Sequence, residues 1–344
     1  MTVRIAFAGI RHYHANFWAK AVLSSDKAEV AGVWDADGVA AAAFCQEHGL
    51  ACAQSLDDLL AACDGVAICS ATSEHRALIE AACRARKPIL CEKPLATSVA
   101  EGREIARMVD AAGIPFQQSF PKRLDPATRE VQRIVRDGTL GRIHLVRVRH
   151  GHSHGLEPDF HQAWFTDPAL SGGGTLLDEG IHAADFLRLV FGNPQSVIAS
   201  HSSGLGLPVE DTALAAFCYV DGMIAEVATS WCFAAADASI EIYGTEGTLL
   251  LSGVDIASRP TRESGFLRLF TRAEGWRDLD LVPSFRTGVF HEHVAWAFIA
   301  ALAEGAALPS GLADGLGAGA MIEAAYRAAA TGIRQDIVYP EAAQ

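Results

Sequence analysis

The sequence lacks any hydrophobic run long enough to span a bilayer, and it lacks a secretion signal at its start. No apolar segment approaches the roughly 20 residues that a membrane-spanning helix needs. The N-terminus has no basic region followed by an apolar core, and residues 3–8 predict a strand instead. These absences exclude a membrane protein, and we therefore expect a cytoplasmic one.

Positive charge and paired cysteines are also scarce. The 28 Lys and Arg residues are outnumbered by 41 Asp and Glu, so the formal net charge is −13. This balance disfavours nucleic acid and anionic membranes as partners. None of the eight cysteines belongs to a C-x-x-C pair, and most stand among Ala, Val or Leu. Free thiols act there as small apolar fillers, which indicates a reducing compartment rather than a disulfide framework.

With 344 residues, of which 50% are hydrophobic, the chain is long enough for two domains. Residues 1–122 alternate short apolar runs with helical segments, which predicts an α/β Rossmann domain built on a parallel, doubly wound sheet. Ligands of such sheets bind at the carboxyl ends of the strands. The predicted strands are 5–8, 30–34, 65–69, 88–91 and 114–116, and the predicted helices are 14–24, 38–48, 55–63, 74–86 and 98–112.

The turn after the first predicted strand is a damaged dinucleotide motif. A Rossmann fold usually has G-x-G-x-x-G here, and only Gly9 remains, with Arg11 and His14 at the other two glycine positions. Arg11 or His12 can contact a pyrophosphate by charge, or can block it. Because the rest of the pattern is intact, we favour cofactor binding.

Acidic and small residues end the next strands of the predicted sheet. Asp35 stands where a carboxylate accepts hydrogen bonds from the ribose hydroxyls of NAD, and its charge disfavours the 2′-phosphate of NADP. It could instead cap the following helix. The small residues from Ser70 onward leave space near the nicotinamide, although Thr72 or Ser73 could simply cap the helix that begins near Glu74.

Two separate strings carry groups suited to catalysis. Lys93 follows the apolar run 89–91 and precedes a proline, and Asp178 and His182 are spaced i, i+4 in the predicted helix 175–191. They therefore share a helical face. A cation, an acid and a base in one pocket suit proton and hydride chemistry on a hydroxyl. The plainer alternatives are that Lys93 is a surface lysine, and that Asp178 and His182 belong to a polar helix face in contact with solvent.

Residues 123–344 predict an α+β domain with a large open, mostly antiparallel sheet. His150, His152 and His154 alternate, so a strand would place them on one face. We favour a polar substrate rim there, and a divalent metal site with Asp178 or His182 is the alternative. Residues 258–284 predict strands with a long loop. Expected substrate contacts are Arg123, His161 and Trp164, and no ligand role is assigned to His14, His291 or His293.

These motifs resemble those of the Gfo/Idh/MocA family, named after glucose–fructose oxidoreductase, inositol dehydrogenase and rhizopine catabolism. The resemblance covers nearly the whole chain, and the first-turn glycines are its clear departure. The supporting segments are Ala71-Thr72 with His75, Glu92-Lys93-Pro94-Leu95, the run from Gly172 to His182 with Asp185, Glu210-Asp211-Thr212, Ile242 to Thr248, and Ala324 to Arg327.

The resemblance implies an NAD-dependent dehydrogenase acting on a sugar or polyol, with a cis Lys93–Pro94 bond. It implies a Rossmann domain over 1–122, a substrate and oligomerisation domain over 123–344, and a homodimer or homotetramer formed through the second sheet. His182 is then the general base, and Lys93 stabilises the charge that develops on the substrate oxygen. Asp178 orients the substrate or tunes His182. The expected cofactor residues are Gly9, Arg11, His12, Asp35, Ser70, Thr72, His75, Glu92 and Lys93. A non-redox binding protein, a lyase or glycosidase with tightly bound NAD, and a metal-assisted enzyme remain alternatives.

Overall fold

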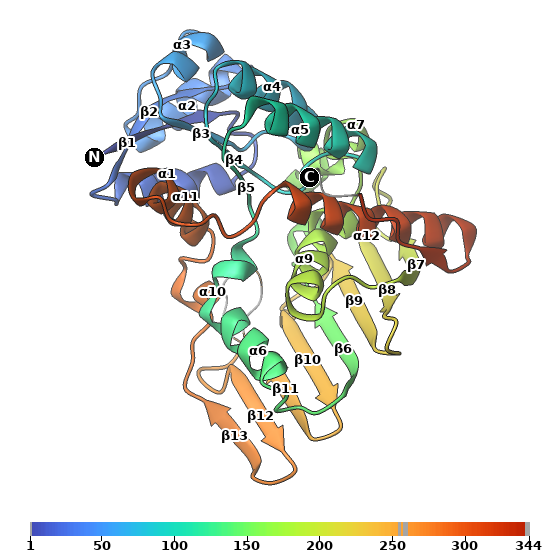
Figure 1. Ribbon diagram of the computed structural model, residues 1–344. Coiled ribbons are helices and arrows are strands. Elements are labelled where there is room, and N and C mark those ends of the chain that lie inside the picture. The colour runs from blue at the N-terminus through green and yellow to red at the C-terminus, as the bar shows by residue number, and fades with distance from the viewer. Residues whose placement is uncertain (1, 254–255, 257–260, 341–344) are drawn as a thin grey trace. The chain divides into compact units, whose positions relative to one another are not determined.

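The computed structural model describes residues 2–253, 256 and 261–340, and these form two compact units (Figure 1). The first unit contains the described residues through Pro121 together with His291–Leu316. The second contains Lys122–Phe290 and Gly317–Pro340. A segment late in the sequence therefore packs with the N-terminal unit.

The first unit is built on a five-stranded parallel sheet in the order β2-β1-β3-β4-β5, which confirms the predicted Rossmann fold. The last three strands are buried at every residue, which explains the continuous apolar runs of β3 and β4. The fifth strand lies two residues later than predicted, because its buried Gln117 and Gln118 hid it. The strands are β1 (Val3–Ala8), β2 (Ala28–Trp34), β3 (Gly65–Ile68), β4 (Ile89–Cys91) and β5 (Phe116–Gln118).

Three helices of this unit begin at capping side chains. Asp37, Ser55 and Ser98 each accept a hydrogen bond from a first-turn backbone N–H of α2, α3 and α5. The late helix α11 packs on α1, where the Trp296 indole donates to the carbonyl oxygen of Ala21 at 3.2 Å. The helices are α1 (His14–Leu23), α2 (Gly38–His48), α3 (Leu56–Ala61), α4 (His75–Arg84), α5 (Val99–Ala112) and α11 (Glu292–Glu304), with the short 3-10 helix η1 (Thr72–Glu74).

The second unit contains a nine-stranded sheet in the order β13-β12-β11-β10-β6-β9-β8-β7-β14. Among the pairings that the described strands of this sheet form, only β6–β9 is parallel, so the prediction of a large, mostly antiparallel sheet is confirmed. The strands are β6 (Ile143–Arg149), β7 (Ser196–Ser202), β8 (Thr212–Cys218), β9 (Ile224–Ser230), β10 (Ser239–Gly244), β11 (Gly247–Leu251), β12 (Leu267–Thr271), β13 (Gly275–Leu279) and β14 (Gln335–Asp336).

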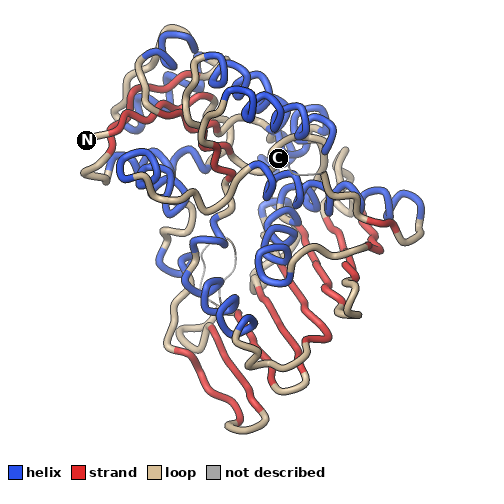
Figure 2. Tube along the Cα trace, viewed as in Figure 1, coloured by secondary structure: helices blue, strands red, loops and turns tan. Residues whose placement is uncertain are grey.

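Helices pack against this sheet, and Figure 2 shows them as blue tubes beside the red strands. The 3-10 helices between β6 and α7 are η3 (His154–Leu156), η4 (Pro158–Gln162) and η5 (Trp164–Thr166), and η2 (Pro121–Leu124) precedes α6. The α-helices are α6 (Pro126–Arg136), α7 (Pro168–Ser171), α8 (Thr175–Asp178), α9 (Gly180–Phe191), α10 (Ser284–Thr287) and α12 (Leu312–Thr331), of which the part from Gly317 onward belongs to this unit. None of the described helices is long and apolar enough to cross a membrane.

Two local predictions in this unit are wrong. The helix expected over 175–191 is interrupted at Glu179, which separates α8 from α9. The strand β6 ends at Arg149, so the three alternating histidines do not share one strand face, and His154 is exposed in η3. The strands expected within 258–284 are β12 and β13, and residues 258–260 of that interval lie outside the described residues.

One face of the large sheet leaves apolar side chains exposed. Leu214 of β8 pairs directly with Ser200 and Ala228, and Ile224 pairs with Cys218, so Leu214 and Ile224 point to the same face. Their side chains are 49% and 44% exposed. The alternating residues of β8 and β9, such as Ala215 and Ala225, are buried on the opposite face.

The expectation that the cysteines are free is wrong for one pair, because Cys45 and Cys52 form a disulfide with Cα atoms 6.1 Å apart. The helix α2 ends at Gly49, whose positive φ of 67° reverses the chain. Cys52 then pairs with Val33 beside β2, which returns it to Cys45. Sequence spacing alone did not reveal this return. The six other cysteines are free.

Candidate active site

The turn after β1 requires glycine at position 9. Gly9 has a φ of +79°, and a Cβ atom there would lie 2.5 Å from the Cβ of Ser70. Arg11 is exposed, with its guanidinium 3.7 Å from the carboxylate of Glu74, whereas the side chain of His12 is buried. The exposed charge at position 11 can therefore attract an anion, while position 12 belongs to the interior.

Asp35 is fixed at the end of β2 by two backbone amides. Its carboxylate accepts hydrogen bonds from Ile10 N and Asp37 N, each at 2.8 Å. The alternative that Asp35 caps α2 is wrong, because the cap is Asp37, which accepts from Val39 N and Ala40 N. The half-buried Asp35 carboxylate keeps acceptor capacity on both oxygens.

The segment after β3 is organised by Glu74 rather than by its hydroxyl residues. The Glu74 carboxylate accepts from Ala71 N at 3.1 Å, and neither Thr72 nor Ser73 caps α4, so that alternative is also wrong. Ser70 donates to the carbonyl oxygen of Ala71. Thr72 is buried.

Lys93 is buried at the carboxyl end of β4, with 3% of its surface exposed. It is therefore not the surface lysine of the alternative interpretation. The Lys93–Pro94 peptide bond is cis, as expected. The His75 ring places Nδ1 3.0 Å from the carbonyl oxygen of Pro94, and burial lowers the pKa of His75. A neutral His75 that donates from Nδ1 thus supports the Lys93 segment.

A cluster of three imidazoles and one carboxylate lies close to Lys93 in the first unit, and all of these side chains except the half-buried His291 are buried. His14 Nδ1 is 3.3 Å from Glu92 Oε1, and the His14 ring centroid is 4.1 Å from that of His12 and 3.7 Å from that of His291. Burial, followed by the charges of His14 and Lys93, holds the pKa of His12 well below its usual value. Burial raises the pKa of Glu92, and the Lys93 ammonium opposes this shift. The sequence did not reveal that His14 and His291 join this cluster.

In the second unit, the three-glycine segment begins α8 on a buried carboxylate. Glu210 accepts from Gly174 N at 3.0 Å and from Leu176 N at 2.9 Å, and the Tyr326 hydroxyl donates to it at 2.7 Å. A Cβ atom at position 174 would lie 1.9 Å from the carbonyl oxygen of Glu210. These motif residues therefore build the start of the helix.

The interruption after α8 turns Glu179 inward, where two histidines meet its carboxylate. His150 Nε2 lies 3.3 Å from Glu179 Oε2, and His152 Nε2 lies 3.4 Å from Oε1. The rings of His150 and His182 are 5.2 Å apart, and all four side chains are buried. Asp178 accepts a hydrogen bond from the Trp231 indole at 3.0 Å. Glu179 is the residue that sequence reasoning missed, and its signal was a carboxylate directly before Gly180, the first residue of α9.

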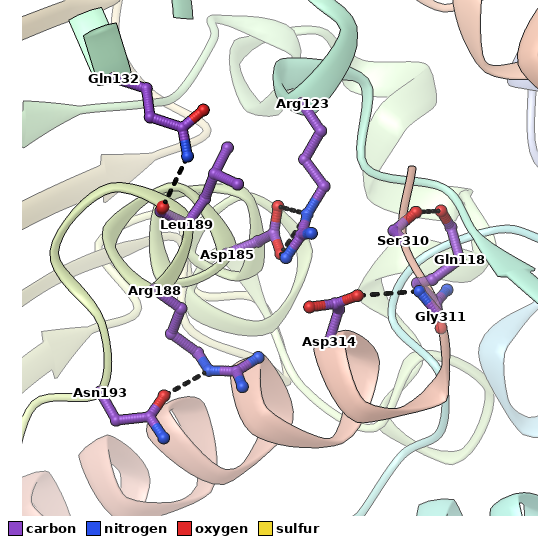
Figure 3. A network of polar contacts seen from close by, with 10 residues as sticks. All are labelled: Gln118, Arg123, Gln132, Asp185, Arg188, Leu189, Asn193, Ser310, Gly311 and Asp314. Atoms are coloured by element: carbon purple, nitrogen blue, oxygen red, sulfur yellow. Dashed lines mark hydrogen bonds and ion pairs between the residues drawn. The ribbon is translucent and has the colours of Figure 1, made fainter. Parts of the chain in front are cut away.

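Arg123 and Asp185 form a buried pair rather than an open binding group (Figure 3). The Arg123 Nε donates to both carboxylate oxygens of Asp185, at 3.0 and 2.9 Å, and a terminal nitrogen donates at 2.7 Å. The preceding Lys122 is buried, and its pKa is lowered to about 8 by burial, against the attraction of Asp125 and Glu179. The predicted contact of Arg123 with substrate stays a prediction.

The other predicted substrate residues lie in the 3-10 segments of the second unit. Trp164 stacks on Phe165 with ring centroids 4.0 Å apart. His161 is exposed, and its Nε2 lies 2.7 Å from the carbonyl oxygen of Gly155. These contacts hold both rings in place, and their roles toward substrate remain predictions.

Comparisons with known proteins agree in both units. The profile of an oxidoreductase family with an NAD-binding Rossmann fold matches residues 3–120, and that of the GFO/IDH/MocA C-terminal domain matches residues 128–250. The chain is 31% identical to the 1,5-anhydro-D-fructose reductase of Ensifer adhaerens, over 94% of this chain and 95% of that protein. It is 28% identical to inositol 2-dehydrogenase 2 of Saccharopolyspora erythraea, over 96% and 94% of the two chains.

The fold is also that of solved oxidoreductase structures. The structure of levoglucosan dehydrogenase in complex with NADH and levoglucosan superposes with a TM-score of 0.83 at 20% identity, and the match covers 98% of this chain and 100% of that one. At this identity the likeness concerns the fold alone.

Proposed function

Because the chain belongs to the GFO/IDH/MocA family of oxidoreductases with an NAD-binding Rossmann domain, we propose that it oxidises a secondary alcohol of a sugar or cyclic polyol with NAD. The observation that carries the proposal is Lys93, a lysine buried at the carboxyl end of a central parallel strand. Ligands of such sheets bind at this edge, and a buried cation there can stabilise a developing alkoxide.

The residues of the first unit fit NAD. Asp35 offers two oriented carboxylate oxygens for ribose hydroxyls, and its charge disfavours a 2′-phosphate. Arg11, exposed beside the strained Gly9 turn, offers the charge that a pyrophosphate needs. Ser70 and Thr72, with the cluster of His12, His75 and Glu92, would complete the cofactor side. When bound, NAD supplies the acceptor for the hydride.

The protein's own groups manage the proton and the charge on oxygen. We assign proton acceptance from the substrate hydroxyl to a ring nitrogen of His182, since imidazole titrates near working pH. The Lys93 ammonium holds the same oxygen while the C–H bond breaks and the C=O bond forms. Asp178, itself fixed by the Trp231 indole, orients the substrate. Trp164, His161 and Arg123 remain candidates for substrate contact.

A substrate panel tests this function. We expect NADH to form when the protein and NAD are mixed with inositols, aldoses or 1,5-anhydrohexitols, for at least one compound. The same substrate should give a kcat/KM with NADP at least about 10-fold lower than with NAD, a difference of roughly 1.4 kcal/mol, because the Asp35 carboxylate repels the 2′-phosphate. An Asp35→Ser variant should reduce the preference for NAD, so that its kcat/KM values with NAD and NADP lie closer together. Tight NAD binding by calorimetry with no turnover across the panel, in either direction, would contradict the proposal.

The other functions considered from the sequence are not favoured. The relatives are named as a reductase and a dehydrogenase, which supports redox turnover over a non-redox binding role or a lyase.

We also propose that the exposed sheet face with Leu214 and Ile224 joins copies of this chain. Leu214 and Ile224 expose apolar side chains on one face of two paired strands, and association through that face would bury them. The molar mass from light scattering should be that of a dimer or tetramer for the wild type. For a Leu214→Glu/Ile224→Lys variant, it should fall toward the mass of the monomer. The proposal fails if the wild type is monomeric at micromolar concentration.

A further inference from the structure

The groups around Glu179 are spaced like the ligands of a metal ion. The distance of 3.3 Å from His150 Nε2 to Glu179 Oε2 exceeds the roughly 2.7–2.9 Å of a charge-assisted hydrogen bond. Two ligands held tetrahedrally by zinc, with bonds near 2.0–2.1 Å, lie about 3.4 Å apart. The ligand atoms of His150, Glu179 and His182 all lie within 4.8 Å of one another, so small side-chain rotations would bring the third ligand into place.

We propose that His150, Glu179 and His182 bind one divalent transition-metal ion, of which Zn²⁺ suits the donors best. Two imidazoles and one carboxylate form a recurring zinc ligand set, which leaves a fourth position open. The three side chains are buried and belong to one unit of the fold. The site needs neither NAD nor substrate, so it stands apart from the proposed function.

His152 supports the site without being a ligand. Its Nδ1 accepts a hydrogen bond from the backbone N–H of His154 at 3.1 Å, so in the neutral ring the proton is on Nε2. That N–H faces Glu179 Oε1 at 3.4 Å. His152 therefore orients the carboxylate while Oε2 faces His150, the arrangement by which outer residues fix metal ligands.

The charge around the cluster also favours a cation. Asp178 and Glu179 are adjacent, and ligand atoms of His152 and both carboxylates lie within 4.8 Å of one another. The buried Lys122 also interacts electrostatically with Glu179, and burial lowers its pKa to about 8.

Metal binding has a consequence for His182. A ring nitrogen that coordinates zinc has no lone pair left for a proton. If His182 is the base of the proposed dehydrogenase, the zinc-loaded protein is inactive and a chelator restores turnover. This consequence rests on the proposed function, whereas the binding itself does not.

Calorimetry on chelator-treated full-length protein, without NAD or substrate, tests the site. We expect one Zn²⁺ per chain, and Co²⁺ in its place should give visible d–d absorption of a four- or five-coordinate ion. Glu179→Gln and His150→Asn should each weaken Zn²⁺ binding by at least about 100-fold, and His152→Asn by roughly 10–100-fold, as expected for a residue that only orients a ligand.

The matched control is His154→Asn, which removes a neighbouring but exposed imidazole. It should leave the affinity unchanged. Because Glu179→Gln could impair folding, the zinc-induced rise in Tm is compared with the Tm of each metal-free variant; a variant that folds without metal and shows no rise supports the site. Wild-type protein that binds no zinc, or binding lost in His154→Asn but kept in Glu179→Gln, overturns the proposal and leaves the dehydrogenase proposal standing.

Discussion

Replacing Lys93 by Met is expected to lower kcat by about 10²–10³-fold, the loss typical of removing one donor from a developing oxyanion. Methionine keeps the apolar stem and a similar volume, so the buried position at the end of β4 stays filled. The dissociation constant of NAD should change little, because the ammonium acts mainly on the reacting oxygen. Steady-state kinetics and NAD calorimetry on the same preparation measure the two quantities.

The matched control is Lys27→Met, which removes an exposed ammonium paired with Glu304 and should leave kcat unchanged. A Lys93→Met/His182→Asn double variant adds a second criterion. If both groups act on one hydroxyl, the combined loss should be much smaller than the product of the single losses. An unchanged kcat in Lys93→Met, with weakened NAD binding, would restrict Lys93 to the cofactor.

Replacing Asp185 by Ala is expected to lower the free energy of unfolding by about 3–5 kcal/mol, because it leaves the Arg123 guanidinium buried without its carboxylate. The side chains of Arg123 and Asp185 are only 11% and 1% exposed, and three hydrogen bonds join them. Urea unfolding followed by circular dichroism measures the loss.

Asp137→Ala supplies the comparison, since Asp137 pairs with Arg133 at the same 2.7 Å but on the surface, where such a pair contributes at most about 1 kcal/mol. Arg123→Met/Asp185→Ala should recover much of the stability, because it removes the isolated charge. If Asp185→Ala costs no more than Asp137→Ala, the buried pair is not the source of stability that the geometry indicates.

Local patterns predicted much of the first unit, because β3 and β4 are apolar runs and α2, α3 and α5 each begin at a capping side chain. The predicted and observed bounds of α2 coincide, where Asp37 begins the helix and Gly49 ends it. The shifted β5 shows the limit. Its glutamines are satisfied by distant groups, Gln117 by the carbonyl oxygen of Val294 and Gln118 by those of Cys91 and Glu92. No local pattern contains such partners.

In the candidate site too, short motifs identified some residues, whereas others come together only in the folded chain. Lys93 and His182 stood out because they belong to short strings with recognisable neighbours. The ring of His291 contacts that of His14 although the two residues are far apart in the sequence. Glu179 lies close to His150 because the helix is interrupted between Asp178 and Gly180. The prediction assumed one unbroken helix over 175–191, so it gave Glu179 no role.

The return of His291–Leu316 to the first unit has a consequence for synthesis of the protein. Phe298 of α11 is almost fully buried, and its ring lies against the start of β3 at Gly65. During synthesis on the ribosome, the first unit therefore cannot complete its packing until α11 has emerged. Part of its apolar surface stays uncovered until then. The N-terminal half is translated first but finishes folding only after the second sheet has been made.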